Sequence, residues 1–338
     1  MRINAAVVGG GSWGTTVAHI VAHNVPTTLW ARHSDTVDQI NSQHRNERYL
    51  PGYDLHPDLR ATQDLGEAVA GADVVVMGVP SHAYRETLTM VARHIRAWVP
   101  LVSLTKGLEQ GSKLRMSQIA NEILPGHPFA VLTGPNLAKE ILAGDAAAAV
   151  IATADGVVAN ELQHIFSSQL FRVYTNPDVI GCELGGALKN VIAIASGMAD
   201  GLGTGDNTRS MVITRGLSEL GRLGTAMGGQ EITFAGLAGM GDLIATCISP
   251  QSRNRHVGEQ LGMGRSIDEV IASMNMVAEG VKTAKVVNEL GQEYGIELPI
   301  CEAVMSVCHE GATATEAYRG LLRHETGVEH HTYRFWVE

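Results

Sequence analysis

Two lysines lie in surroundings that could direct an ammonium group to chemistry. Lys189 stands among small and apolar residues in the helix-like run 182–192, and Lys106 follows the strand-like run 101–104. Burial would lower the pKa of the Lys189 ammonium and suit it to general acid–base catalysis. A lysine that reaches the surface from an amphipathic helix fits the same pattern, and spacing alone favours that interpretation. Lys106 would lie at the ligand-binding carboxyl edge of a parallel sheet, or in an exposed loop.

A second group of polar residues, in the run 239–255, is suited to an anion. Arg253 is flanked by Ser252 and Asn254 at the expected start of a helix. A guanidinium and the free N–H groups of a helix end can together bind a phosphate or a carboxylate. A capped helix with solvated arginines explains the same run. Asp242 could orient a lysine, bind a hydroxyl or cap a helix.

A glycine-rich turn near the N-terminus predicts a dinucleotide site. Gly9, Gly11 and Gly14 match G-x-G-x-x-G between the apolar run 5–8 and the helix-like run 15–22. The three glycines would supply a tight turn, close approach of the backbone to a pyrophosphate, and close packing of helix on strand. The start of the helix would add N–H donors for the phosphates.

The residues after the next strand, expected at 27–30, bear on the choice of cofactor. Arg32 stands near the position where an NAD site usually has Asp or Glu to hold the ribose 2′-hydroxyl. A cation there could pair with a 2′-phosphate, which favours NADPH over NADH. Arg32 could instead be solvated and stack on adenine, and Asp35 could reach a ribose if the loop bends.

The elements that must position these residues follow two patterns. In the first half, short β-branched runs alternate with longer amphipathic runs, which predicts a parallel sheet flanked by helices. The further strands expected are 74–79, 101–104, 129–132, 147–151 and 171–174. After Pro177 long helical stretches follow, joined by glycine-rich turns. We therefore predict an α/β fold, with a Rossmann-like dinucleotide-binding domain over 1–178 and an all-α substrate and dimerisation domain over 179–338.

Composition excludes several classes of protein. The chain has 338 residues, enough for two domains, and a formal net charge of -10, which argues against a nucleic-acid surface. We see no stretch that is long and apolar enough to span a membrane, and no signal peptide, so a cytoplasmic protein is expected. The four cysteines have no C-x-x-C spacing and are expected to be reduced thiols. The tail 330–336 mixes histidines with aromatics, and we expect packing there rather than a metal site.

Across nearly its whole length the chain resembles the bacterial type of NAD(P)-dependent glycerol-3-phosphate dehydrogenase. The matching segments are GGGSWGT, VPSH, KGLE, TGPNLAKE, GALKNVIAIASGMADGLG, TFAGLAGMGDLIATC, SRNRHVGEQLG and VAEGVKTA. The resemblance implies reversible hydride transfer between a nicotinamide and C2 of glycerol 3-phosphate or dihydroxyacetone phosphate. It also implies that the product feeds glycerophospholipid synthesis, and the apolar, glycine-rich helices suggest a homodimer.

The resemblance also assigns roles to residues. Lys189 matches the family's catalytic lysine, which overturns the interpretation of a lysine that reaches the surface. The implied substrate site consists of Lys106, Gly134, Asn136, Lys189, Asp242, Thr246, Ser252, Arg253 and Asn254. The implied site for NADPH or NADH consists of Gly9, Gly11, Ser12, Trp13, Gly14, Arg32, His33, Lys106, Ala138, Arg253, Val277 and Glu279. No metal is implied.

Position 136 departs from the family pattern. The family commonly has Ser or Thr there, whereas this chain has Asn136, which keeps a hydrogen-bonding side chain of different length. From the sequence alone, the run 133–140 is a turn that enters a helix, with Asn136 as the N-cap and a charged residue after it that completes a capping box.

Two rival functions fit parts of the sequence. Another reductase with a Rossmann head and a helical tail, such as a ketopantoate reductase or a 3-hydroxyacid dehydrogenase, would act on a carboxylate. A sensor that binds NADPH without turnover would keep the glycine fingerprint, and fold alone does not exclude it. Such a sensor would have no need of Lys106 and Lys189 together.

Overall fold

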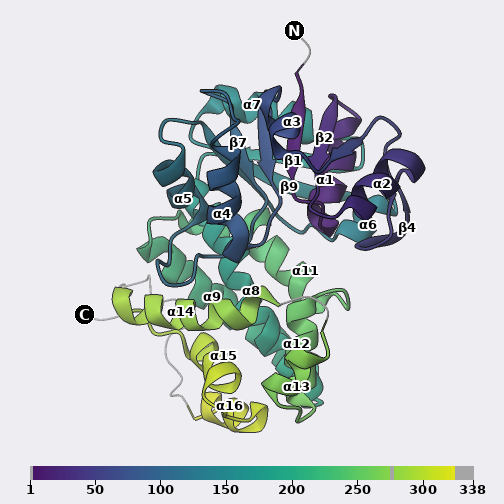
Figure 1. Cartoon of the computed structure of the whole chain (residues 1–338). Coiled ribbons are helices and arrows are strands. Elements are labelled where there is room, and N and C mark those ends of the chain that lie inside the picture. Colours follow the sequence, from purple (N-terminus) through teal and green to yellow (C-terminus); the bar gives the residue numbers. More distant parts are fainter. Residues whose placement is uncertain (1–2, 275–277, 324–338) are drawn as a thin grey trace.

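A computed structural model describes residues 3–274 and 278–323 of the chain. Figure 1 shows two regions, a sheet with its helices at one end and a group of helices at the other. We call the part from β1 to β10 the sheet region and the part from α8 to α16 the helical region. The predicted α/β class, with a Rossmann-type sheet followed by helices, is confirmed.

The sheet region is built on eight strands. They are β1 (Ala5–Val8), β2 (Thr27–Trp30), β5 (Arg60–Thr62), β6 (Val74–Met77), β7 (Leu101–Ser103), β8 (Phe129–Thr133), β9 (Ala147–Ala152) and β10 (Phe171–Asn176). Their order in the sheet is β10-β9-β8-β7-β6-β1-β2-β5. The six strands from β5 to β8 follow the order of a dinucleotide-binding sheet, in which the direction of winding reverses between β1 and β6.

Helices connect these strands and cover both faces of the sheet, as parallel connections require. They are α1 (Ser12–Ala22), α2 (Ser34–Gln43), α3 (Leu65–Ala70), α4 (Ser81–Val91), α5 (Met116–Ile123), α6 (Ala138–Leu142) and α7 (Gly156–Phe166). Alternate side chains of the strands belong to two separate cores. Val7 and Val76 pack in one, while Val8 and Val75 pack in the other.

Two features of the sheet region differ from the sequence prediction. Strand β9 runs antiparallel to β8, although β10 is again parallel to β9, so the sheet is not wholly parallel. A short hairpin of β3 (Arg45–Asn46) and β4 (Leu50–Asp54) was not predicted. The first difference arises because strand alternation in the sequence carries no information on strand direction.

At two positions of the turn between β1 and α1, the protein's own backbone conformation and packing require glycine. Gly9 has φ +127°, a backbone conformation that side chains disfavour. A Cβ on Gly14 would lie 2.1 Å from the carbonyl oxygen of Gly9, so α1 could not pack so closely on the strand. These are the turn and packing roles that the fingerprint predicts.

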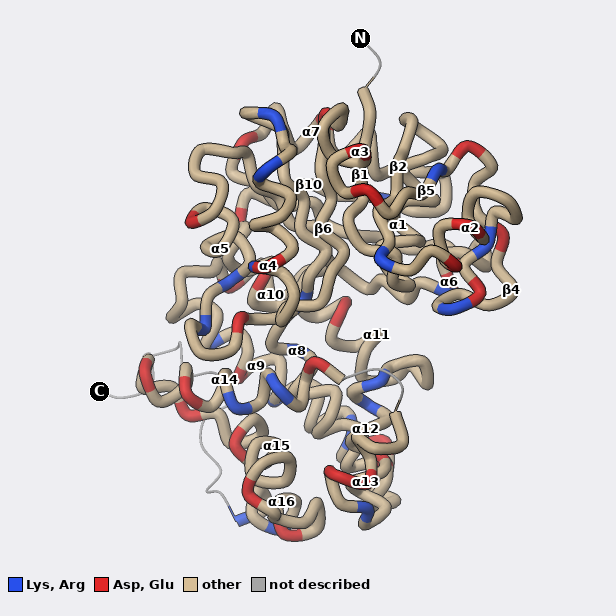
Figure 2. The backbone as a smooth tube through the Cα atoms, in the orientation of Figure 1, with Lys and Arg blue, Asp and Glu red and all other residues tan. Residues whose placement is uncertain are grey.

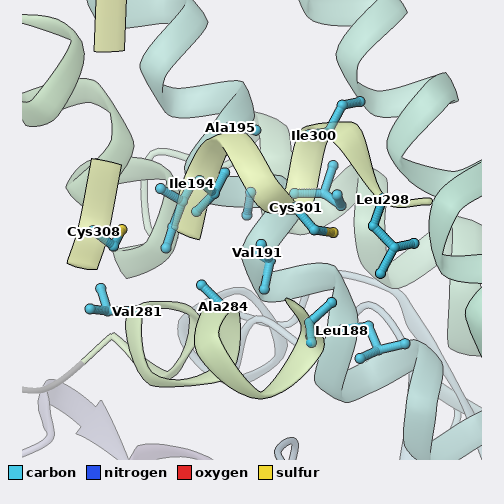
Figure 3. Close-up of a cluster of buried hydrophobic side chains, with 14 of the residues drawn as sticks. Leu188, Val191, Ile194, Ala195, Val281, Ala284, Leu298, Ile300, Cys301 and Cys308 are labelled. Carbon is cyan, nitrogen blue, oxygen red and sulfur yellow. The ribbon is translucent and has the colours of Figure 1, made fainter. Parts of the chain in front are cut away.

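The helical region follows β10, and none of its described residues forms a strand. Its elements are α8 (Val179–Gly201), α9 (Asp206–Ala226), α10 (Glu231–Phe234), a short π-helical stretch η1 (Leu237–Gly241), α11 (Asp242–Ile248), α12 (Arg253–Gly262), α13 (Ile267–Ala272), α14 (Glu279–Tyr294), α15 (Pro299–His309) and α16 (Ala314–Leu321). The Asp178 side chain accepts a hydrogen bond from the Gly181 amide and so caps α8. Figure 3 shows the apolar core in which Leu188, Val191 and Ile194 of α8 meet α14 and α15.

By length and composition alone, two stretches are long and apolar enough to cross a membrane, although the sequence analysis identified none. They are Val179–Gly201, which is α8, and Glu231–Ile248. The apolar window of α8 is 89% buried inside the protein, which identifies α8 as the central helix of this core. The second stretch is divided among α10, η1 and α11. Length and composition are therefore weak evidence for a membrane span here.

Glycines let α8 and α12 touch backbone to backbone. On α8, a Cβ at Gly197 would lie 2.0 Å from the carbonyl oxygen of Arg255. On α12, a Cβ at Gly258 would lie 2.0 Å from the carbonyl oxygen of Ile194. This contact fixes the start of α12 relative to α8, and the candidate site depends on both.

The four cysteines, Cys182, Cys247, Cys301 and Cys308, are buried and form no disulfide. Burial raises the pKa of every one of these thiols. Thiols of this kind are poor nucleophiles and poor metal ligands, because the thiolate is the reactive form.

Candidate active site

One buried lysine and one half-buried lysine meet a buried aspartate between the two regions. The Nζ of Lys189, on α8, donates to Asp242 Oδ1 at 2.5 Å and to Thr246 Oγ1 at 2.5 Å. The Nζ of Lys106, in the loop after β7, donates to Asp242 Oδ2 at 2.7 Å and to the Gly134 carbonyl at 2.9 Å. We call Lys106, Lys189, Asp242 and Thr246 the lysine–aspartate cluster.

Burial decides between the two sequence interpretations of Lys189. The residue is 5% exposed and Asp242 is 2% exposed, so Lys189 does not reach the surface. Both lysines are hydrogen-bonded to an anion, which satisfies the general requirement for a buried charge. Asp242 therefore orients lysines, as one of its alternatives proposed, although it is also the first residue of α11.

Local packing brings Lys106 to α8. At Gly186 a Cβ would lie 2.9 Å from Thr133 Oγ1 and 3.5 Å from Cγ of Lys106, so glycine leaves room for the lysine side chain. Gly134, at the end of β8, has φ +134°, and a Cβ there would lie 3.1 Å from the Cα of Ala149. This turn presents the carbonyl of Gly134 to Lys106.

The cluster carries more positive than negative charge when both lysines are protonated. The pKa of Lys106 is lowered to about 8, chiefly by desolvation and in part by the Lys189 ammonium, while Asp242 opposes the shift. Two ammoniums with one carboxylate leave a net positive field, which favours a ligand oxygen that gains negative charge. The cluster also holds a proton donor on each lysine.

The start of α12 lies beside α8, where the second polar group was predicted. Ser252 is the N-cap of α12 and its Oγ accepts from the Arg255 amide at 3.2 Å. Arg253 is the first residue of the helix and lies in the field of Glu279. The capped helix is present, and because Arg253 lies at its start, the cap does not exclude the predicted anion site.

The side chain of Asn254 connects three segments of the site. Its Nδ2 donates to Asn190 Oδ1 on α8 at 2.9 Å, and its Oδ1 accepts from the Gly280 amide on α14 at 2.9 Å. The residues that precede these three are Lys189, Arg253 and Glu279. The Asn254 amide therefore holds the neighbours of three candidate site residues in register.

The glycine-rich turn has a geometry that fits a pyrophosphate. A Cβ on Gly11 would meet no atom within 4 Å, and its φ of -73° is open to any residue. Neither backbone conformation nor the protein's own packing explains this glycine, whereas close approach of a ligand does. Gly11 is also the N-cap of α1 without a side-chain hydrogen bond, so the N–H groups of Ser12 and its neighbours are not capped by a side chain there.

The indole Nε1 of Trp13 is buried and has no hydrogen-bond partner.

The other candidate cofactor residues that the structure describes lie in loops and helix starts that follow the glycine-rich turn along the chain. Arg32 and His33 lie between β2 and α2, and Ala138 is the first residue of α6. Glu279, the first residue of α14, accepts from Ser81 Oγ at 2.9 Å and so joins the helical region to the start of α4. Val277 and the tail 330–336 lie outside the described residues.

The capping role predicted for Asn136 was wrong. The N-cap of α6 is Leu137, and no side chain caps this helix. The helix begins one residue later because Leu137, the residue after Asn136, is extended, with φ -85° and ψ 105°. Both amide atoms of Asn136 are buried and have no hydrogen-bond partner in the protein. Unpaired buried amide atoms are costly, and a ligand that offers both a donor and an acceptor would satisfy them.

The sequence analysis did not single out some residues of the site, although the family-like segments contain them. In the sequence, Ser81 and Asn190 look like ordinary polar residues of a helix. Their hydrogen-bond partners lie 198 and 64 residues away along the chain. Only the adjacency of Asn190 to Lys189 marks it. Among the described residues, no group of three His, Cys, Asp or Glu side chains could hold a metal ion.

Fold and geometry together define a class, a protein with a Rossmann-type nucleotide-binding sheet followed by helices that complete a buried cationic site. Two family models match the chain. The N-terminal model of NAD-dependent glycerol-3-phosphate dehydrogenase matches residues 4–159, and the C-terminal model of the same family matches residues 178–319. The chain belongs to the NAD-dependent glycerol-3-phosphate dehydrogenase family.

Individual relatives agree over the whole chain. A glycerol-3-phosphate dehydrogenase [NAD(P)+] 2 of Sphingopyxis alaskensis is 59% identical, over 98% of this chain and 99% of the relative. A glycerol-3-phosphate dehydrogenase [NAD(P)+] of Mycobacterium avium is 58% identical, over 96% of each. The crystal structure of glycerol-3-phosphate dehydrogenase from Coxiella burnetii has a TM-score of 0.91 at 38% identity and covers 96% of this chain and 99% of that one. A ketopantoate reductase of Ralstonia eutropha, at 14% identity and TM-score 0.59, shares the fold alone.

Proposed function

We propose that the protein catalyses reversible hydride transfer between NADPH or NADH and the C2 position of dihydroxyacetone phosphate or glycerol 3-phosphate. The observation that carries the proposal is the lysine–aspartate cluster at the carboxyl edge of a nucleotide-binding sheet. Family membership and the relatives' names support it. The bound nicotinamide supplies or accepts the hydride. The protein's own residues bind and orient the substrate, and they transfer a proton to or from its C2 oxygen.

Lys189 is the proposed catalytic residue. As the C2 carbonyl oxygen gains negative charge, the Lys189 ammonium stabilises that charge and donates a proton to it; in the oxidation direction the neutral amine accepts the proton. Lys106 adds positive potential at the same oxygen. Asp242 accepts hydrogen bonds from both lysines, 2.5 Å and 2.7 Å from their Nζ atoms, and so fixes both ammoniums in place.

The substrate phosphate needs an anchor of its own. We assign it to the start of α12, where Ser252, Arg253 and Asn254 combine a guanidinium with a helix N-terminus. Gly134, Asn136 and Thr246 are proposed to line the substrate site. The proposed cofactor site consists of Gly9, Gly11, Ser12, Trp13, Gly14, Arg32, His33, Lys106, Ala138, Arg253, Val277 and Glu279. NADPH is the favoured cofactor because of Arg32.

The remaining features of the proposal concern the whole protein. We propose a dinucleotide-binding domain over 1–178 and a substrate and dimerisation domain over 179–338, in a cytoplasmic homodimer that contributes to glycerophospholipid synthesis. Buried thiols without a disulfide are consistent with a reducing compartment. Sedimentation equilibrium of the purified chain tests the dimer.

The test of the activity is the absorbance of reduced nicotinamide with dihydroxyacetone phosphate, with NADPH and NADH in parallel. We expect oxidation that falls at least about 100-fold in Lys189→Ala, since general acid–base catalysis contributes about that much or more. The dissociation constant for NADPH should stay within about twofold, because Lys189 acts on the substrate oxygen. Lys285→Ala, which removes an exposed lysine of α14, is the matched control and should keep the parent turnover.

Several outcomes would contradict the proposal. A Lys189→Ala variant that keeps turnover within about tenfold of the parent removes Lys189 from the chemistry. If reduced nicotinamide is oxidised with ketopantoate or a 2-keto acid, but not with the phosphate ester, the substrate is a carboxylate. Binding of NADPH without oxidation of any of these substrates favours a sensor.

A further inference from the structure

The hairpin that the sequence did not predict is anchored to the glycine-rich turn. Asn46, at the end of β3, is fully buried. Its Nδ2 donates to the carbonyl of Gly10 at 3.0 Å and to Thr15 Oγ1 at 2.9 Å. Both acceptors belong to the turn and helix that would hold the pyrophosphate. Asn46 therefore holds the hairpin against the glycine-rich turn.

Arg48 lies in the turn of this hairpin and faces the start of α2. Its Nη1 lies 3.7 Å from Asp35 Oδ2, and its guanidinium lies 5.8 Å from the centre of the Tyr49 ring. Both side chains of the ion pair are exposed, at 47% for Arg48 and 60% for Asp35. An exposed pair at this distance contributes little to stability, so its partners can be exchanged at small cost. Basic and acidic positions lie close together around α2 and β4 in Figure 2.

The start of α2 is a helix end that no side chain caps. His33 is the N-cap and makes no side-chain hydrogen bond to the first turn. Thr36, in that turn, is 1% exposed and its hydroxyl has no hydrogen-bond partner in the protein. Arg32 precedes the helix and is exposed. A helix N-terminus with unpaired donors, next to an arginine, is suited to an anion.

We propose that Arg48 is a specificity-determining residue that binds the 2′-phosphate of NADPH together with Arg32 and the N-terminus of α2. The proposal rests on the proposed function only through its cofactor. The 2′-phosphate distinguishes NADPH from NADH and carries up to two negative charges. Two guanidiniums, one from the β2–α2 loop and one from the hairpin, can approach it from different sides, each with a fork that fits phosphate oxygens.

Asp35 is the counter-ion that Arg48 exchanges for the phosphate. Its carboxylate lies at the same helix start and opposes a second anion there, so it must turn away when the 2′-phosphate binds. Its exposure leaves room for that movement. Removal of the charge in Asp35→Asn should strengthen NADPH binding several-fold and leave NADH binding unchanged. If Asp35 instead holds the ribose of NADH, the same variant weakens NADH binding.

The test compares binding of NADPH and NADH to the full chain by titration calorimetry, with 2′,5′-ADP and 5′-AMP as fragment probes. In Arg48→Ala we expect the dissociation constants of NADPH and 2′,5′-ADP to rise at least tenfold. Those of NADH and 5′-AMP should stay within twofold. Arg48→Lys, which keeps the charge but not the fork, should fall between the parent and Arg48→Ala. Raised salt should weaken NADPH binding more than NADH binding.

Arg45→Ala is the matched control. Arg45 belongs to the same hairpin, is 45% exposed and pairs with Asp54 at 2.8 Å, so its loss removes an equal charge away from the helix start. We expect this variant to bind NADPH like the parent. Equal weakening of NADPH and NADH in Arg48→Ala, or equal effects of Arg45→Ala and Arg48→Ala, would overturn the assignment. Selective loss of NADPH binding, with no turnover of dihydroxyacetone phosphate in the parent, would support the assignment and contradict the proposed function.

Discussion

The sheet region and the helical region prepare the candidate site in opposite ways. In the sheet region, several buried polar groups near the proposed cofactor and substrate sites lack hydrogen-bond partners within the protein. The Trp13 indole nitrogen, the Asn136 amide and the Thr36 hydroxyl are buried without a hydrogen bond. In the helical region, the charged groups already have partners, since Lys189 and Asp242 are bound to each other and to Thr246.

This difference suits the sheet region to binding a ligand and the helical region to holding charged groups in place before the reaction. Unpaired buried polar atoms are costly until a ligand satisfies them, so the sheet region is suited to binding energy and selectivity. A paired, buried cluster does not have to reorganise when charge develops on a substrate, so the helical region is suited to the chemical step. Variants in the two regions should therefore change different quantities.

The largest effect is expected when the cluster loses its anion. In Asp242→Asn the buried Lys189 ammonium and the half-buried Lys106 ammonium would share a neutral amide, which leaves their charge without an anionic partner. Breaking a buried pair in this way costs about 3–5 kcal/mol of folding stability. Turnover should also fall by about 100-fold or more, because the proposed proton donor loses the carboxylate that orients it. Affinity for NADPH should change by less than about threefold, because Asp242 is not among the proposed cofactor residues and most of these lie in the sheet region. Steady-state kinetics and cofactor titration measure the two effects separately.

Asp200→Asn is the control for this variant. Asp200 is also on α8 and accepts hydrogen bonds from Arg255 at 2.9 Å and Arg209 at 3.2 Å, away from the cluster. It should lower the melting temperature and leave turnover within about threefold. Equal losses of turnover in both variants would show that α8 responds to any lost ion pair, and the cluster would have no special role.

Glycines allow a second test of the same contrast. Gly258→Ala places a methyl group 2.0 Å from the backbone oxygen of Ile194, and overpacking of this kind costs about 1–3 kcal/mol. We expect a fall of several degrees in the melting temperature. Gly11→Ala meets no protein atom within 4 Å, so it should leave the melting temperature of the free protein unchanged. Its dissociation constant for NADPH should rise at least tenfold.

The outcome is read from a pair of measurements, thermal unfolding without cofactor and NADPH titration. A Gly11→Ala protein that unfolds earlier but binds NADPH normally would mean that the turn, like α8, uses glycine for internal packing. The distinction between the two regions would then fail at the nucleotide turn.

Sequence reasoning was most accurate where the determinants are local. Strands β1 and β2 begin and end at the predicted residues, because each is a short apolar run bounded by turn residues. The fingerprint glycines follow from the same local geometry. The hairpin at 45–54 escaped prediction because its strands are short and polar, with Pro51 and Gly52 inside β4. The direction of β9 depends on its neighbours in the sheet.

The lysine–aspartate cluster could not be predicted from local sequence, because its members are far apart along the chain. Lys189 meets Asp242 across 53 residues, and Lys106 meets Asp242 across 136. Spacing alone therefore favoured a surface position for Lys189, and only the resemblance to a family corrected it. The burial of a charged residue depends on a partner, and a partner far along the chain leaves no periodic signal.

The smallest effect expected is a pH dependence that arises at the border between the regions. Lys106 belongs to the sheet region but binds Asp242 of the helical region, and its pKa is lowered from 10.5 to about 8, first of all by desolvation. Above about pH 8 the ammonium loses its proton, and kcat/KM for dihydroxyacetone phosphate should fall, by up to about tenfold per pH unit. The Lys106 contribution to stability has the opposite sign. Between about pH 8 and 10.5 the unfolded chain binds more protons than the folded one, so the free energy of unfolding contributed by this group rises with pH.

Lys106→Arg separates this lysine from Lys189. A guanidinium stays charged over the whole range, so the fall of kcat/KM above about pH 8 should disappear even if the maximum is lower. Urea unfolding of parent and variant over the same range should show a smaller rise of stability in the variant. If the variant keeps the fall in kcat/KM, the titrating group is not Lys106. If only the stability profile changes, Lys106 is a structural link between the two regions rather than part of the charge that the substrate oxygen meets.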